Sequence, residues 1–81
     1  MYVYILVRVN CHSERDTLGV YKTEQRAVMA MNKDFKEYFG DDLSLDQGDS
    51  DHYDVKVYEV YYNNDLSHFG EFYSITKMEL K

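Results

Sequence analysis

Apolar positions recur with two different periods along the chain, and each period predicts a different kind of element. Over residues 2–11, β-branched and aromatic side chains dominate, which favours a strand. Residues 18–22 predict a short second strand, and residues 53–62 and 71–80 return to the same strand character. The pattern therefore predicts four strands.

Residues 24–39 instead repeat apolar side chains at helical spacing. Thr23 is a favourable N-cap, Glu24 places negative charge in the first turn, and Gly40 supplies a stop. At about 100° per residue, the apolar side chains fall within an arc of roughly 120°. They are Ala27, Val28, Met31, Phe35, Tyr38 and Phe39. We expect one amphipathic helix over residues 24–39.

The predicted order is strand, strand, helix, strand, strand. A right-handed crossover through the helix brings the third strand beside the first, where it runs antiparallel. The 81 residues then form a single α+β domain over residues 1–81, a four-stranded antiparallel sheet in the order 2-1-3-4 with the helix on one face. One helix covers only one face of such a sheet.

Alternation along the strands predicts which residues occupy the uncovered face. They are Tyr2, Tyr4, Leu6, Tyr58, Val60 and Tyr62. A contiguous apolar and aromatic patch of this kind usually marks an interface, so the pattern predicts self-association as a homodimer. In the alternative, the long loop or the segment over residues 63–70 folds over this face.

The charge is concentrated in one segment. The chain has 15 acidic and 9 basic residues, for a formal net charge of −6. Residues 41–54 contain six aspartates and neither lysine nor arginine; removing them leaves nine acidic residues (15 less 6) against nine basic ones. Most of this segment, residues 41–52, is predicted to be a loop. An excess of acid also argues against direct binding of nucleic acid, which requires cations to neutralise phosphates.

Three interpretations of the acidic segment remain open. It is a solvated loop that keeps the protein soluble, a weak metal site at Asp49, Asp51 and His52, or an anionic patch for a basic partner. The spacing does not fit an EF-hand. In the third interpretation the aspartates face a groove lined by lysine and arginine, and Tyr53 stacks on arginine. The partner-binding residues would be Asp41, Asp42, Asp46, Asp49, Asp51, Tyr53 and Asp54.

The sequence offers little for catalysis. Cys11 and His12 are neighbours on a predicted strand, so their side chains point to opposite faces and do not form a nucleophile pair. The triplet Asp54–Lys56 faintly resembles the acid-x-Lys element of metal-dependent nucleases, but the required upstream acid has no clear place. The four glycines are isolated, which excludes a glycine-rich phosphate loop. We therefore expect a protein that is not an enzyme and uses neither a cofactor nor a catalytic metal.

The location of the protein is predicted from two features. Cys11 is the single cysteine, which excludes an intrachain disulfide and suits a reducing cytoplasm. The longest apolar run, residues 3–7, is far shorter than the ~20 residues that a membrane helix needs. We expect a cytoplasmic protein without a membrane partner.

The chain resembles, at the level of a class, the small acidic inhibitors that phages and mobile elements encode, such as anti-CRISPR proteins and DNA mimics. The acidic segment over residues 41–54, the short chain and the lack of active-site residues carry this resemblance. The run Leu18–Ala27 also resembles a strand-to-helix junction of small phage and bacterial domains. The resemblance implies a non-enzymatic inhibitor of a basic, nucleic-acid-handling host protein, such as a CRISPR effector. The alternative is a small regulatory or structural module that self-associates through its tyrosine-rich face.

Overall fold

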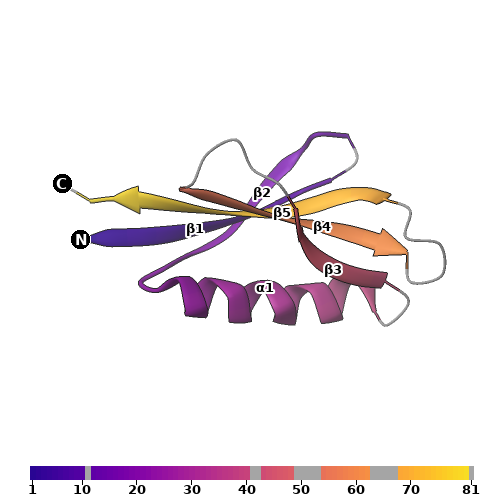
Figure 1. Ribbon diagram of the computed structural model, residues 1–81, viewed down its shortest axis with the longest axis horizontal. Coiled ribbons are helices and arrows are strands. Elements are labelled where there is room, and N and C mark those ends of the chain that lie inside the picture. The colour runs from indigo at the N-terminus through magenta and orange to yellow at the C-terminus, as the bar shows by residue number, and fades with distance from the viewer. Residues whose placement is uncertain (11, 41–42, 49–53, 63–67, 81) are drawn as a thin grey trace.

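The computed structural model describes residues 1–10, 12–40, 43–48, 54–62 and 68–80. These residues form an α+β fold with five strands and one helix (Figure 1). In chain order the elements are β1 (Tyr2–Val9), β2 (Arg15–Tyr21), α1 (Glu24–Phe39), β3 (Leu43–Gly48), β4 (Val55–Tyr62) and β5 (His68–Glu79). The predicted fold class is confirmed, but the described sheet has one strand more than the sequence pattern predicts.

The strands form one antiparallel sheet in the order β2-β1-β5-β4-β3, which differs from the predicted order. The predicted third strand corresponds to β4, and it does not lie beside β1. The last strand, β5, has 12 residues and lies between them, with β1 along one edge and β4 along the other. Tyr2 to Val9 pair with Glu79 to Phe72 on one side, and β4 pairs with β5 on the other.

The extra strand lies inside the segment that was predicted to be a loop. Leu43 to Gly48 form β3, which pairs with β4 from Leu43 opposite Tyr62 to Gly48 opposite Val57. From β2 at one edge, the chain crosses one face of the sheet as α1 and reaches the opposite edge at β3 (Figure 1). It then returns through β4 to β5 in the middle. The helix therefore connects the two edge strands.

The helix has the bounds that the sequence predicts. The hydroxyl oxygen of Thr23 accepts a hydrogen bond of 3.2 Å from the backbone N–H of Arg26, so Thr23 is the N-cap. Gly40 ends the helix with φ +78° and ψ −156°, a conformation that L side chains rarely adopt. Local sequence signals therefore fix both ends of α1.

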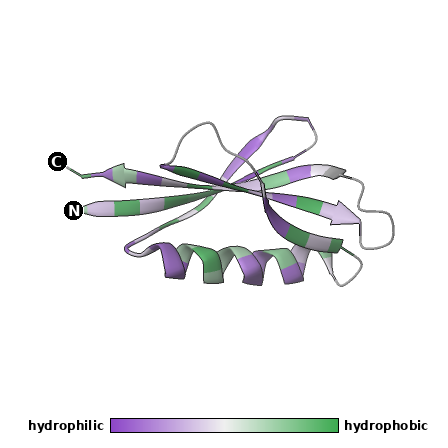
Figure 2. Cartoon of the chain, viewed as in Figure 1, coloured by the Kyte–Doolittle hydropathy of each residue, from purple (hydrophilic) through white to green (hydrophobic). Residues whose placement is uncertain are grey.

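The helix packs against the face that the sequence analysis left uncovered. Apolar bands recur along α1 and β1, separated by polar or pale bands (Figure 2). The buried core lies between helix and sheet and consists of Leu6, Ala27, Met31, Val60, Tyr73 and Ile75. Leu6 and Val60 are 0% exposed, and Tyr4 and Tyr58 pack against the same core. The prediction of an uncovered tyrosine-rich face is therefore wrong; of its six residues, Tyr2 and Tyr62 are the most exposed, at 47% and 43%.

The predicted alternation of side chains between the two faces of the sheet is correct. Only the prediction of which face the helix leaves uncovered is wrong. Both faces of β1 are apolar, so periodicity does not indicate which one the helix covers. On the covered face, the Arg8 side chain and the Tyr73 hydroxyl both reach Asp34 of α1. The other face carries Val3, Ile5 and Val7, and the registers of β1 and β4 place Phe72 and Val57 of the neighbouring strands on it too.

Candidate functional site

The acidic segment contains an edge strand. β3 occupies the middle of residues 41–54 and is the last strand of the described sheet. Its residue Asp46 is exposed and lies directly opposite Glu59 of β4, so two carboxylates are cross-strand neighbours. Glu59 also accepts a hydrogen bond from the Tyr61 hydroxyl. Like charges directly opposite each other are unfavourable in a sheet pair, and a positive charge beside Asp46 would offset this repulsion.

Of the predicted partner-binding residues, the structure describes two. Asp46 lies in β3, and Asp54 is exposed immediately before β4, where its backbone carbonyl accepts a hydrogen bond of 2.8 Å from the Lys77 N–H. The remaining five lie outside the described residues: Asp41, Asp42, Asp49, Asp51 and Tyr53.

A groove lies between β3 and the C-terminal half of α1. Its cavity volume is about 460 Å³. The lining combines three apolar side chains with a lysine, an asparagine and the helix-ending glycine: Asn32, Phe35, Lys36, Gly40, Leu43 and Leu45. Phe35, Leu43 and Leu45 are partly buried and pack against the core. An apolar side chain of a partner could therefore lie in this groove beside the edge strand.

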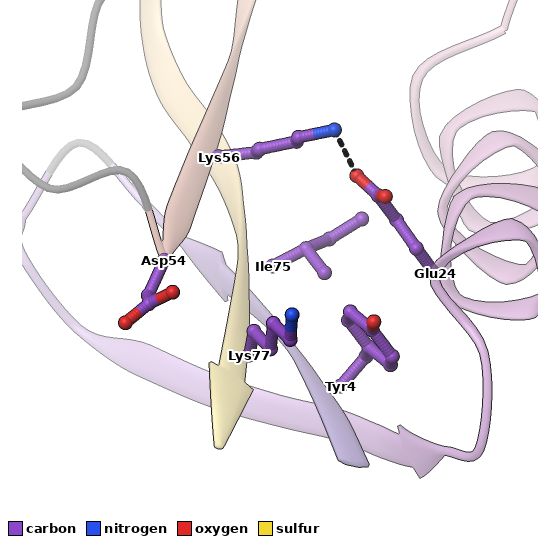
Figure 3. A pocket seen from close by; sticks show the side chains of 6 residues that line it. All are labelled: Tyr4, Glu24, Asp54, Lys56, Ile75 and Lys77. Atoms are coloured by element: carbon purple, nitrogen blue, oxygen red, sulfur yellow. Dashed lines mark ion pairs between the residues drawn. The ribbon is translucent and has the colours of Figure 1, made fainter. Parts of the chain in front are cut away.

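A second, smaller cavity lies near the start of the helix. Its volume is about 210 Å³, and Figure 3 shows its lining residues, Tyr4, Glu24, Asp54, Lys56, Ile75 and Lys77. Lys56 of β4 forms an ion pair with Glu24 in the first turn of α1, and the hydrogen bond to Glu24 raises the pKa of Lys56. Lys77 lies 4.2 Å from the centre of the Tyr2 ring. Two lysines and two carboxylates balance in charge, and the Lys56–Glu24 ion pair joins the first turn of α1 to β4.

A polar cluster at the other end of the helix joins α1 to the sheet. Arg8 Nη1 lies 3.0 Å from Asp34 Oδ2, and the Tyr73 hydroxyl donates to the same oxygen at 2.6 Å. Asp16 Oδ2 is 3.7 Å from Arg8 Nη2, and the guanidinium carbon of Arg8 lies 4.0 Å from the centre of the Tyr38 ring. Burial, followed by the hydrogen bond to Asp34, raises the pKa of Tyr73 well above its ordinary value. The Asp34 contacts to Arg8 and Tyr73 are partly buried and join the helix to the sheet, whereas Asp16 and Tyr38 are exposed.

The described residues contain no group of three or more histidine, cysteine, aspartate or glutamate side chains that could hold a metal ion. The alternative metal site, at Asp49, Asp51 and His52, lies outside these residues. No helix in the described part of the chain is long and apolar enough to cross a membrane. The described residues do offer an edge strand that carries Asp46, beside a groove with a mixed apolar and polar lining.

The sequence pattern does not predict the groove between β3 and α1. The alternation Leu43, Ser44, Leu45, Asp46 is a strand signal, but it is short and lies among turn-forming residues. Phe35 was predicted only as part of the apolar face of the helix. Comparison of the chain with known protein families, with curated proteins and with solved structures finds no match. Inferences about function therefore depend on the geometry described above.

Proposed function

We propose that this protein is a non-enzymatic binding protein that presents its acidic segment to a basic partner. The partner we propose is a nucleic-acid-handling host protein with a groove lined by lysine and arginine, such as a CRISPR effector. The protein would inhibit it in the cytoplasm by occupying the site built for phosphates. The observation that carries this proposal is the position of β3, an edge strand in the middle of the acidic segment.

The edge strand reduces the entropy that binding would cost. Fixing the backbone of one residue costs roughly 1–2 kcal/mol, so a free acidic loop would lose much of its binding energy to ordering. Residues 43–48 are already ordered by their pairing with β4. Binding through Asp46 would therefore not have to order the strand that carries it.

The charge distribution supports the same proposal. The six aspartates account for the whole net charge of −6, and the rest of the chain is balanced. An acidic region on an otherwise neutral body orients the protein toward a cationic groove and speeds association. Because the Debye length falls from about 10 Å at 0.1 M salt to about 3 Å at 1 M, binding should weaken steeply with salt.

The test is capture from a bacterial lysate with two charge-matched variants. In the first, Asp41, Asp42, Asp49 and Asp51 are all changed to Asn. The control carries the same change in charge at exposed positions elsewhere: Glu14→Gln, Asp16→Asn, Glu37→Gln and Glu79→Gln. We expect the wild type and the control to enrich the same basic, nucleic-acid-handling proteins at low salt, and the first variant to lose them. Equal enrichment by all three proteins would exclude the acidic-segment mechanism.

A second candidate function is self-association, now through the sheet face opposite α1. Val20 is 58% exposed and pairs with Ile5, and Met78 is 49% exposed and pairs with Val3, so this face presents apolar side chains on neighbouring strands. The face that the sequence analysis named for self-association is instead the one that the helix covers. Light scattering after size-exclusion chromatography tests this candidate. A dimer that Val20→Asp converts to a monomer would support it, and a monomeric wild type would exclude it.

A further inference from the structure

The two edges of the sheet differ in how they discourage pairing with another chain. At the outer strand β2, the pairing with β1 shifts register between Leu6 and Val7, and exposed Arg15 and Asp16 begin the strand. Such irregularities and charges are the usual means by which edge strands avoid further pairing. β3 pairs with β4 without a register shift, contains neither proline nor lysine, and carries a single charged side chain, Asp46. No described strand pairs with its outer edge.

The side chains of β3 alternate between two surroundings. Leu43 and Leu45 point to the helix side of the sheet, where they line the groove with Phe35. Asp46 points to the opposite side, where its neighbour across the strands is Glu59. The side chains of a strand added at this edge would also alternate between the two faces of the sheet. One row would face the groove, and the other row would lie on the side of Asp46.

We propose that the outer edge of β3 accepts an extended segment of the partner as a sixth strand. Backbone hydrogen bonds to β3 would hold this segment, since alternate residues of an edge strand direct their N–H and C=O groups outward. One row of its side chains, apolar, would enter the groove between β3 and α1. The other row, lysine or arginine, would lie beside Asp46. This inference rests on the proposed function, and it specifies how the basic partner would bind.

Charge decides between a partner of this kind and a second copy of the chain. Pairing two β3 strands edge to edge would bring the acidic segments of both copies together. Like charges at close range across an interface cost several kcal/mol, so the second copy is disfavoured. A basic segment is favoured for the same reason. The mixed lining of the groove, with Asn32 and Lys36 beside three apolar side chains, also suits a peptide better than an entirely apolar ligand.

The probe for the test is a fluorescent nine-residue peptide of alternating valine and lysine. A second peptide has the same sequence but carries N-methyl groups on alternate residues along one edge, which removes the backbone donors without changing charge. We expect the first peptide to bind, with NMR shift changes confined to β3 and to residues 32–40. We expect the N-methylated peptide to bind at least tenfold more weakly.

The variant Asp46→Lys tests the edge itself, because it places on β3 the residue that most often protects edge strands. Its matched control is Asp16→Lys on β2, which changes the net charge equally at the other edge. We expect Asp46→Lys to weaken binding of the alternating peptide at least tenfold and Asp16→Lys to change it less than twofold. Circular dichroism checks that both variants fold.

The outcomes separate this inference from the proposed function. Equal affinity for the two peptides, or shift changes away from β3, would overturn strand addition. If capture of basic proteins from the lysate still required the four aspartates, the proposed function would stand and only strand addition would be excluded. In the opposite case, the four aspartates do not affect capture from the lysate, but N-methylation weakens peptide binding at β3. This result would refute the acidic-segment mechanism and leave the edge of β3 as a binding site.

Discussion

Tyr73 donates a hydrogen bond of 2.6 Å to Oδ2 of Asp34, and this bond joins the middle strand of the sheet to the helix. Tyr73 is 0% exposed, so its hydroxyl needs a partner inside the fold. Asp34 serves Arg8 as well, through the same carboxylate oxygen at 3.0 Å. One helix carboxylate therefore satisfies two side chains from two neighbouring strands, β1 and β5.

Removing this carboxylate should destabilise the protein considerably. Asp34→Ala leaves the Tyr73 hydroxyl and the Arg8 guanidinium, whose side chain is 16% exposed, without their shared acceptor. Leaving buried donors unsatisfied costs more than the hydrogen bonds contribute, so we expect a loss of about 2 kcal/mol in the free energy of unfolding. Urea denaturation measures it. The control is Asp16→Ala, which removes a 3.7 Å contact to Arg8 from a side chain that is 64% exposed. That variant should change stability by less than about 0.5 kcal/mol, and equal losses in both would contradict the assignment.

The Tyr73 hydroxyl should also make the protein sensitive to alkali. Burial and the hydrogen bond to Asp34 raise the pKa of Tyr73 above its ordinary value of 10.0. The unfolded chain therefore loses this proton at a lower pH than the folded protein does. The stabilisation is fully present below pH 10 and is lost as the pH rises above it.

Tyr73→Phe isolates this contribution. We expect the variant to be less stable than the wild type at pH 8, because Asp34 loses a hydrogen bond. Above pH 10 the gap should narrow by up to about 1.4 kcal/mol per pH unit, since phenylalanine does not titrate. The free energies of unfolding of both proteins, measured from pH 8 to 11, give the result. A gap that stays constant with pH would show that Tyr73 loses its proton equally easily in the folded and unfolded states.

Local signals in the sequence were sufficient to predict the bounds of the helix. They were also sufficient to predict which residues of a strand lie on the same face of the sheet. Thr23 and Gly40 mark the two ends of α1 because capping depends on the residues at the ends themselves. β3 could not be found in this way. Its four alternating residues, 43–46, form a strand because β4 pairs with them, and the paired residues are 13 to 19 positions away in the sequence.

The position of β5 in the sheet also depends on contacts between residues that are distant in the sequence. The same is true of which face of the sheet the helix covers. β5 reaches the middle of the sheet because two strands pair with it, and neither pairing is visible in its own sequence. The helix covers the face that carries Arg8 and Tyr73, where Asp34 satisfies both. A search for polar groups able to meet across the core would have indicated this face. The acidic segment was correctly located by its charge, but its edge strand and the adjoining groove depend on the same unpredicted pairing.

The helix core should depend on Met31 and not on Met29. Met31 is 1% exposed and belongs to the core, whereas Met29 on the same helix is 63% exposed. Met31→Ala removes the same atoms as Met29→Ala but leaves a cavity, and such losses cost about 2–5 kcal/mol in buried positions. We expect Met29→Ala to change stability by less than about 0.5 kcal/mol. Thermal and urea unfolding of both variants check this, and similar effects would show that α1 presents a different face to the sheet.

Gly40 should be required for its backbone conformation alone. Its φ of +78° and ψ of −156° are strained for L residues, while a Cβ added there would meet nothing within 4 Å. Gly40→Ala should therefore destabilise the protein by about 1–3 kcal/mol through strain, without a steric clash. D-alanine is the informative control, because these angles are the mirror image of polyproline II, which an L residue adopts readily. The chain is short enough for chemical synthesis, so urea denaturation can compare all three proteins. D-alanine should restore the stability of the glycine protein. An equal loss with both alanines would show that the Cβ itself, rather than the handedness of the backbone, is excluded where the chain leaves α1 for β3.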